Sequence, residues 1–386
     1  MHKNQNNLAI YIHWPFCQSK CPYCDFNSHV AAQIDHDVWR QAYECELNYY
    51  AQLLQGREVT SVFFGGGTPS LMEPATVELI LGTIRKHWKV ADNIEITLEA
   101  NPGSVEAQKF ADFAKAGVNR LSLGVQSLRN DALKFLGRKH DVAQAKQALQ
   151  IAAQYFPRFS FDLIYARHGQ TEKEWETELR EALTLSNGHL SLYQLTIEPN
   201  TQFYTLANRG EKLIAPEEHA ANMYELTQQI LSDAGMPAYE ISNHARPGLE
   251  SRHNLTYWHY DDYIGIGPGA HGRYQSGDRR FATEDHKAPE VWLRHVAEKN
   301  HGLRVCDVVD NVTAQREALM MNLRLTEGID TQKWQQKFRS SLHDFLPQDK
   351  ITHLIDEKYL VNEADTLKAT EAGLQRLNAV LGYLLG

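Results

Sequence analysis

Short runs rich in β-branched or aromatic residues alternate with longer segments of helical periodicity over the first 234 residues. The runs that predict strands are residues 8–13, 61–64, 94–99, 120–125, 159–165 and 190–197. The segments that predict helices are residues 38–54, 77–87, 142–153, 174–185 and 217–234. Strand followed by helix, repeated, predicts parallel strands joined by right-handed crossovers. Six such units favour an α/β fold built as an open (β/α)6 partial barrel over a closed barrel of eight, and a flat doubly wound sheet fits the same pattern.

Residues with unusual chemistry lie within or directly after these predicted strands. In strand order they are a cysteine cluster, the glycine-rich turn 65–69, Glu99, Gln126 and Asp162. The carboxyl ends of parallel strands meet at one edge of a barrel or sheet, and that edge is where such folds bind ligands. The sequence therefore predicts one site that gathers all five features.

The cysteine cluster is Cys17, Cys21 and Cys24, in the spacing CxxxCxxC. Three neighbouring thiolates can bind three irons of a cubane iron–sulfur cluster. Such clusters usually have four cysteine ligands, so the fourth iron is left open to a small molecule. We therefore predict a 4Fe–4S cluster on these three residues.

Two other readings of the cysteines compete with the cluster. The CxxC pair Cys21 and Cys24 suits thiol–disulfide exchange, but that leaves Cys17 without a role. Zinc needs four ligands, and His13 or His29 can complete the set. The isolated Cys45 and Cys306 are expected to be buried apolar residues.

The rest of the chain changes character after the last predicted barrel helix. We divide the whole chain into a core of residues 1–235, a connecting segment 236–310 rich in glycine and aromatic residues, and a C-terminal domain 311–386.

The C-terminal domain reads as helices with a short hairpin at residues 359–361 and 366–369, which is typical of a winged helix. Its nine Lys and Arg against ten Asp and Glu give a net charge of −1, and the whole chain carries −9. Nucleic-acid binding is therefore disfavoured.

Residues 1–7 are polar, and no run approaches the ~20 apolar residues that a membrane-spanning helix needs. We expect a cytoplasmic protein, with peripheral association at a membrane as an option.

The cysteine motif and its flanking strings, YIHWPFC before it and CDFNS from Cys24 on, resemble the radical S-adenosylmethionine (SAM) superfamily. The resemblance is to the branch that holds oxygen-independent coproporphyrinogen oxidase and haem chaperones, and it runs from residue 11 to about residue 381. It implies that a reduced cluster splits SAM into methionine and a 5′-deoxyadenosyl radical. It also implies a set of SAM-binding residues: Tyr11, Tyr23, Gly66, Gly67, Thr68, Glu99, Gln126, Arg138 and Asp162.

Two features favour the haem-chaperone branch. The oxidase branch resembles C-x3-C-x2-C-x-C, and its fourth cysteine position is Phe26 here. The string HNLTYW, from His253 through Tyr257 to Trp258, matches the HNxxYW string linked to haem binding in the chaperones. This resemblance implies His253 as a haem ligand, with Tyr257 and Trp258 nearby.

The rival haem ligands near this string are His244, His259 and His271. The expected function is thus a haem chaperone with haem as its cargo. The alternative is a radical SAM enzyme acting on a porphyrinogen, such as coproporphyrinogen III.

The resemblance also implies two protein partners: a haem acceptor such as a membrane respiratory enzyme, and an electron donor such as flavodoxin or ferredoxin. One string departs from the family pattern. Where the family has a Gly-Leu-Pro turn after the fifth strand, this chain has Ala166, Arg167 and His168. We expect this change to place two larger polar residues near SAM.

Overall fold

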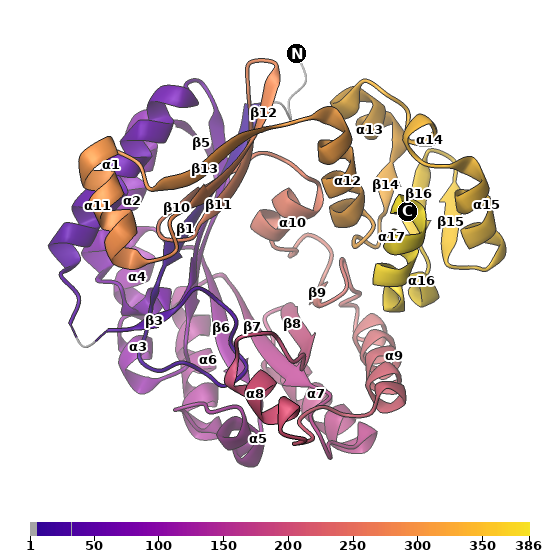
Figure 1. Ribbon diagram of the computed structural model, residues 1–386. Coiled ribbons are helices and arrows are strands. Elements are labelled where there is room, and N and C mark those ends of the chain that lie inside the picture. Colours follow the sequence, from indigo (N-terminus) through magenta and orange to yellow (C-terminus); the bar gives the residue numbers. More distant parts are fainter. Residues whose placement is uncertain (1–5, 32) are drawn as a thin grey trace.

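The computed structural model describes residues 6–31 and 33–386. Its core is an 11-stranded sheet in the order β13-β12-β11-β10-β1-β4-β5-β6-β7-β8-β9. Six parallel strands form the curved barrel wall visible in Figure 1. They are β1 (Asn7–Trp14), β4 (Glu58–Gly66), β5 (Lys89–Ala100), β6 (Arg120–Gln126), β7 (Arg158–Tyr165) and β8 (His189–Gln194). The predicted open six-unit barrel is confirmed, because the described strands leave the wall unclosed between β9 and β13.

Helices cover the outside of this wall (Figure 1). They include α1 (His36–Leu53), α2 (Pro74–His87), α4 (Phe110–Ala116), α6 (Val142–Tyr155), α7 (Glu172–Leu185) and α9 (Glu217–Asp233). Strand residues such as Leu98, Leu121 and Phe161 join the helices in one apolar core. That burial is the main stabilising contribution to the barrel.

The opposite face of the same strands is polar. Because side chains alternate along a strand, Thr97 and Glu99 on β5 face away from the helix layer that Leu98 packs into. Arg120 on β6 pairs in register with Thr97, and Asp162 on β7 pairs with Ser191 on β8. The concave face of the barrel therefore carries the groups that the sequence analysis singled out.

The glycine- and aromatic-rich segment extends the barrel sheet. The strand β10 (Tyr263–Ile266) runs parallel to β1, and three antiparallel strands follow: β11 (His271–Ser276), β12 (Arg279–Asp285) and β13 (Leu303–Val309). At the other edge, β9 (Asn243–Ala245) pairs antiparallel with β8. Helix α11 (Pro289–Lys299) packs on α1, and α10 (Arg252–Trp258) lies on the concave side of the sheet (Figure 1).

The C-terminal residues form a second apolar core of their own. The helices are α12 (Asn311–Asn322), α13 (Thr331–Phe338), α14 (Leu342–Phe345), α15 (Gln348–Asp356), α16 (Glu371–Gln375) and α17 (Leu377–Leu385). The predicted hairpin is present as β15 (Leu360–Glu363) and β16 (Thr366–Ala369), and β14 (Ile329–Asp330) adds a third strand that the sequence pattern missed. The mostly helical, winged-helix-like expectation is thereby met.

Short elements carry the connections that follow the carboxyl ends of the barrel strands. They are β2 (Phe16–Cys17), β3 (His29–Val30), the 3-10 helix η2 (Pro69–Leu71), α3 (Ser104–Gln108), α5 (Asn130–Phe135) and α8 (Gln202–Asn208).

Cys45 is half-buried and Cys306 is exposed, so the prediction of a buried Cys306 was wrong. None of the described helices combines the length and apolarity needed to cross a bilayer.

Candidate functional site: a cysteine loop over the barrel

The three cysteines lie between β1 and β3, in residues 15–28, which we call the cysteine loop. Cys17 ends the short strand β2, Cys21 and Cys24 follow it, and all three are half-buried free thiols. The backbone of the next strand's turn supports this loop. The N–H of Gly67 donates to the Trp14 carbonyl oxygen (2.7 Å), and the N–H of Thr68 donates to that of Phe16 (2.8 Å). A Cβ atom on Gly67 would lie 2.6 Å from the Phe16 carbonyl oxygen. This turn therefore needs glycine in order to approach the cysteine loop.

Each cysteine sulfur has a polar side chain beside it. The Thr68 hydroxyl donates to Cys17 (3.5 Å) and Arg138 Nη1 donates to Cys21 (3.3 Å). The Ser28 hydroxyl lies 4.0 Å from the sulfur of Cys24. Burial raises the pKa of the Cys17 thiol, and the Thr68 hydrogen bond opposes that rise. Such donors stabilise thiolates, the form that binds iron.

Asn101 links two of these donors. Its Nδ2 donates to the Thr68 hydroxyl (3.1 Å), and its Oδ1 accepts from Arg138 Nη2 (2.5 Å). A continuous chain of hydrogen bonds thus joins Cys17, through Thr68, Asn101 and Arg138, to Cys21. Asn101 was not among the residues predicted to bind a cofactor. The available signal was an amide side chain directly after a strand and before Pro102.

A cavity of about 190 Å³ opens beside this chain. Cys21, Asn101 and Arg138 line it together with Gly103 and Glu106. Arg138 is largely buried, and its Nε has no partner among the described residues. The guanidinium therefore keeps one donor free for an anionic ligand such as a carboxylate.

Three more predicted SAM residues lie along the concave face. Burial raises the pKa of Glu99 to about 8, with Asp162 adding repulsion, and burial raises the pKa of Asp162 to about 6. The side-chain oxygen of Gln126 is buried with no partner in the described part of the chain, and its backbone has a left-handed φ of 70°. Carboxyls and an unpartnered amide on this face can bind the hydroxyl and amino groups of a ligand.

The two predicted tyrosines flank the same region. The hydroxyl of Tyr11 lies 3.1 Å from His13 Nδ1, and the hydroxyl of Tyr23 lies 3.5 Å from Arg138 Nη1. Tyr23 therefore belongs to the chain that ends at Cys21. Tyr11 lies on β1, and its ring stacks on that of Phe63 (ring centroids 6.3 Å apart).

The histidines proposed as zinc ligands are already engaged. His13 is buried between the Tyr11 hydroxyl and the Asn27 carbonyl oxygen, which lies 2.9 Å from its Nε2. His29 Nε2 lies 3.2 Å from Asn27 Oδ1. Within residues 6–31 and 33–386, no three His, Cys, Asp or Glu side chains gather as ligands of a single metal ion. The CxxxCxxC spacing of the three thiols along the chain fits a cluster that offers each thiolate its own iron.

The departing string at residues 166–168 turns away from this region. Arg167 is only 8% exposed and pairs with Glu178 on α7 (3.4 Å). Its other nitrogen, Nη1, donates to the Ile164 carbonyl oxygen, while His168 is exposed. The expectation that Arg167 would approach the SAM-binding face was therefore wrong. Glu178 draws it into the layer between β7 and α7.

His253 lies at the start of α10, and its ring centroid is 6.5 Å from that of Tyr11. It is 1% exposed, and both ring nitrogens have partners: the Ser61 hydroxyl at Nδ1 (2.9 Å) and the Tyr257 hydroxyl at Nε2 (2.8 Å). The ring also stacks on Phe63 (5.1 Å). Burial lowers the pKa of His253 to about 3, so the ring is neutral at physiological pH.

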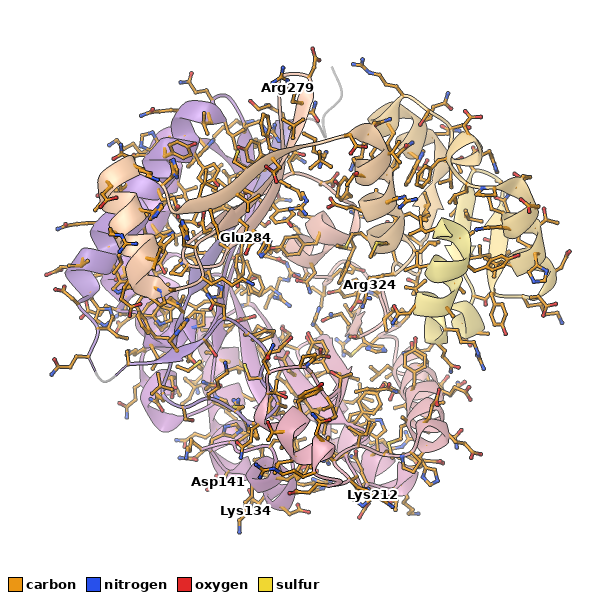
Figure 2. The ribbon with its side chains drawn as sticks, in the orientation of Figure 1. Lys134, Asp141, Lys212, Arg279, Glu284 and Arg324 are labelled. Carbon is orange, nitrogen blue, oxygen red and sulfur yellow. The ribbon has the colours of Figure 1, made fainter. Side chains whose placement is uncertain are left out.

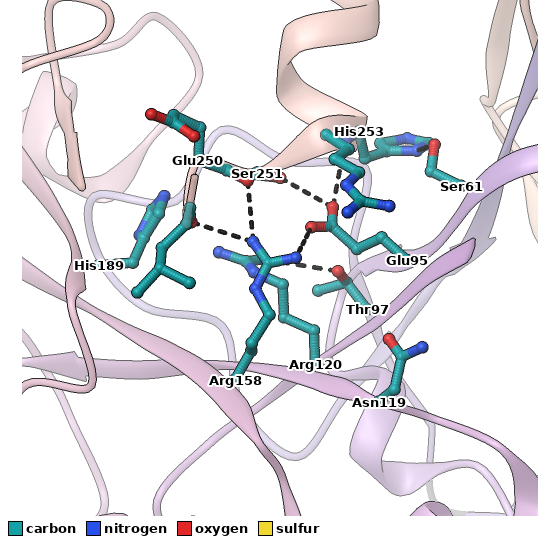
Figure 3. A network of polar contacts seen from close by, with 12 residues as sticks. Ser61, Glu95, Thr97, Asn119, Arg120, Arg158, His189, Glu250, Ser251 and His253 are labelled. Carbon is teal, nitrogen blue, oxygen red and sulfur yellow. Dashed lines mark hydrogen bonds and ion pairs between the residues drawn. The ribbon is translucent and has the colours of Figure 1, made fainter. Parts of the chain in front are cut away.

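A buried carboxylate holds the start of α10 against the barrel (Figure 3). Glu95 Oε1 accepts from the backbone N–H of His253 (3.1 Å) and from the Ser251 hydroxyl (3.4 Å). Arg158 lies 2.9 Å from Glu95 Oε2 and donates to the carbonyl oxygen of Glu250 (2.8 Å). This network was not predicted, because Glu95 and Arg158 read as ordinary charges on two strands that are far apart in sequence.

The far end of α10 contacts the C-terminal domain. The carbonyl oxygen of Trp258 accepts from Asn322, and the guanidinium of Arg324 lies over the Trp258 ring (4.7 Å). The HNLTYW segment therefore bridges the barrel and the C-terminal domain.

The rival haem ligands are dispersed. His244 is buried on β9, His259 pairs with Glu327 (2.6 Å), and His271 starts β11 and is exposed. Phe26 is 61% exposed on the cysteine loop.

Comparisons with known proteins agree with this architecture. The model of the radical SAM superfamily matches residues 11–182, and that of the HemN C-terminal domain matches residues 309–376. The solved structure of coproporphyrinogen III oxidase (HemN) from Escherichia coli superposes with a TM-score of 0.82 at 21% identity, covering 98% of this chain and 90% of that one. At that identity the likeness shows the fold.

Curated relatives match along the whole chain. Heme chaperone HemW of Haemophilus influenzae is 38% identical, and the match covers 98% of each chain. Heme chaperone HemW of Escherichia coli is also 38% identical, with the same coverage. The mitochondrial radical S-adenosyl methionine domain-containing protein 1 of Danio rerio is 37% identical, covering 98% of this chain and 86% of the relative. The chain therefore belongs to the radical SAM superfamily, in the family of the proteins named heme chaperone HemW.

Proposed function

We propose that this protein is a haem chaperone built on a radical SAM core, which binds a 4Fe–4S cluster, SAM and haem and passes haem to an acceptor protein. The observation that carries the proposal is the 38% identity, over 98% of the chain, to proteins named heme chaperone HemW. The thiol loop, the free Arg138 donor and the unpartnered Gln126 oxygen support the cofactor part of it.

Cys17, Cys21 and Cys24 would hold the cluster, and the predicted SAM residues would hold SAM. When bound, the two cofactors supply one-electron reductive chemistry. The chain's own residues do the positioning: Thr68 and Arg138 orient two of the sulfurs, and Asn101 fixes both donors. Arg138 Nε remains available for the SAM carboxylate, and Glu99 and Asp162 for its hydroxyl or amino groups.

Haem binding at His253 requires one hydrogen bond of the imidazole ring to be broken. An iron–imidazole bond needs a ring nitrogen with a free lone pair, and both nitrogens here have hydroxyl partners. The bond to Tyr257 is the more exposed of the two, since the bond to Ser61 is fully buried. We therefore assign Nε2 to the iron, with the Tyr257 hydroxyl displaced when haem binds.

The partners follow from the same proposal. An acidic one-electron carrier such as flavodoxin or ferredoxin reduces the cluster, and a membrane respiratory protein is the acceptor that we favour. The chaperone itself then works in the cytoplasm, with peripheral contact at the membrane where the acceptor resides.

The test is an anaerobic haem titration followed by visible absorbance. The cluster-reconstituted wild type should bind one equivalent, and His253→Ala should bind at least about tenfold more weakly, because an axial bond is lost. His259→Ala and His271→Ala are matched controls that should bind like the wild type. If the wild type shows no saturable binding and instead converts coproporphyrinogen, the chaperone proposal fails in favour of a porphyrinogen enzyme.

A further inference from the structure

A groove of about 430 Å³ lies beside the cysteine loop, outside the barrel. The cysteine loop, α5 and α8 form its walls. It adjoins the cavity next to Arg138, and Ser19, Gly137 and Lys139 line both.

The floor of the groove is apolar and is tied to the cysteine loop. Phe203 on α8 packs against Phe135 on α5 (ring centroids 5.1 Å) and against Tyr23 (6.3 Å). The N–H of Phe203 also donates to the Pro22 carbonyl oxygen (2.8 Å). Phe135 is 36% exposed, so an aromatic surface faces solvent there. Through Phe203, the floor of the groove is therefore in direct contact with the loop that carries the thiols.

The rim of the groove is basic. Lys20, Lys134 and Lys139 are all exposed, and none of them forms an ion pair within the described residues. Figure 2 labels Lys134 at the lower edge of the molecule. Glu211 is the acidic residue on the groove's lining. In a chain of net charge −9, three unpaired lysines around one groove form a local positive field that attracts an anionic partner.

The groove lies next to the cysteine ligands along the chain as well. Lys20 precedes Cys21, Pro22 follows it, and Gly137 precedes the Arg138 that donates to Cys21. A partner seated here would contact residues adjacent to the thiols themselves. Electrons reach a buried metal centre most readily where little protein lies between donor and acceptor.

We propose that this groove is the docking surface for an acidic one-electron carrier protein that reduces the cluster, an inference that rests on the proposed function. The lysine rim meets carboxylates around the carrier's prosthetic group, and the Phe135–Phe203 floor meets the apolar edge of that group. In the redox step, a carrier flavin hydroquinone loses one electron and becomes the semiquinone, and the oxidised cluster gains that electron.

The test compares two triple variants with the same change in charge. The groove variant is Lys20→Glu/Lys134→Glu/Lys139→Glu. The control is Lys86→Glu/Lys173→Glu/Lys299→Glu, at exposed lysines on α2, α7 and α11 that also form no ion pair within the described part of the chain. Both proteins are reconstituted anaerobically, and their iron and sulfide contents are matched to the wild type.

The probe is a purified flavodoxin. The groove variant should bind oxidised flavodoxin at least about tenfold more weakly by calorimetry, and its cluster reduction by flavodoxin hydroquinone should slow by a similar factor. Reduction by dithionite should not change. The control variant should stay within about twofold of the wild type, and raising the salt concentration should slow the wild type more than the groove variant.

Lys134→Glu alone, on α5 and away from the cysteine loop, keeps the test decisive if the triple variant binds cluster poorly. It should weaken flavodoxin binding about threefold. Unchanged flavodoxin binding by the groove variant would overturn the proposal. So would a selective loss of haem affinity, which would assign the lysines to porphyrin carboxylates. Failure of the proposed function shows itself separately, as absence of haem binding by the wild type.

Discussion

The hydroxyl of Tyr257 lies 2.8 Å from Nε2 of His253, one turn further along the same short helix. The two rings meet edge to face, with centroids 4.9 Å apart. Two residues of the string that implied haem binding are therefore partners of each other. A haem iron that takes Nε2 has to compete with this hydrogen bond.

Tyr257→Phe should therefore strengthen haem binding. Removing the hydroxyl leaves Nε2 free while keeping the ring's packing, and a hydrogen bond of about 1 kcal/mol corresponds to roughly a fivefold lower dissociation constant. The measurement is the same anaerobic haem titration. Tyr263→Phe is the control, because the ring centroid of Tyr263 lies 4.5 Å from that of Tyr257. Weaker binding by Tyr257→Phe would contradict this account and would indicate that the tyrosine oxygen itself contacts the iron.

Asn101→Ala should loosen the cysteine loop without removing a ligand. The substitution deletes the link between the Thr68 hydroxyl and Arg138, so both sulfur donors lose their fixed orientation. We expect the cluster to lose iron several times faster on exposure to a chelator and SAM to bind roughly tenfold more weakly, as outer-shell substitutions at metal sites do. Asn119→Ala is the control for a lost amide, because the Asn119 side chain lies directly before β6 and bonds to the backbone of residues 94 and 96. Equal iron loss in wild type and Asn101→Ala would show that the link is dispensable.

The barrel was predictable because its signals are local. Apolar residues such as Leu98 and Phe161 alternate with polar ones, and turn residues follow each strand, so both the strands and the edge that carries the chemistry could be read from the sequence. The extension by β10 to β13 was not predicted. Its strands pair with partners such as β1, more than 250 residues away in sequence, and no local pattern encodes that pairing.

The site was predictable in its ligands but not in its supports. The cysteine spacing identifies the thiols directly, whereas the role of Asn101 depends on Thr68 and Arg138 arriving from two other loops. Arg167 was misplaced for a similar reason, since its partner Glu178 lies on the following helix. The buried environment of His253 could not be foreseen either, because Ser61 comes from a strand 192 residues away.

Glu95→Gln should destabilise the protein and release α10 from the barrel. The carboxylate is buried, pairs with Arg158, and accepts from the His253 N–H, so a neutral amide leaves the guanidinium without its counter-charge. Breaking a buried pair in this way costs about 3 kcal/mol of the free energy of unfolding. The pair of Glu58 with the exposed Lys89 gives the matched control, because solvent screens that pair and Glu58→Gln should leave the urea midpoint nearly unchanged. Urea unfolding compares the two, and equal midpoints would refute the assigned role of Glu95.

Glu46 and Asp285 form a buried carboxyl pair under the sheet extension. Glu46, on α1, accepts from the N–H groups of Gly267 (2.9 Å) and Gly302 (2.5 Å) and from Trp292 Nε1 (3.2 Å). Burial raises the pKa of Glu46 to about 7 and raises the pKa of Asp285 well above its usual value. Repulsion from the Glu46 carboxylate adds to the effect of burial on the pKa of Asp285.

This pair should make folding stability fall as pH rises from about 5 to 8. A carboxyl whose pKa is higher in the folded state binds its proton more tightly there, so its contribution is present at low pH and is lost as pH passes through the folded pKa. Asp285→Asn keeps a donor beside Glu46 and removes one titrating group, so its stability should depend less on pH across that window. Urea midpoints at pH 5, 6, 7 and 8 provide the measurement, and Asp307→Asn on the exposed side of β13 should retain the wild-type slope. A steep slope in Asp285→Asn equal to that of the wild type would show that the pH dependence arises elsewhere.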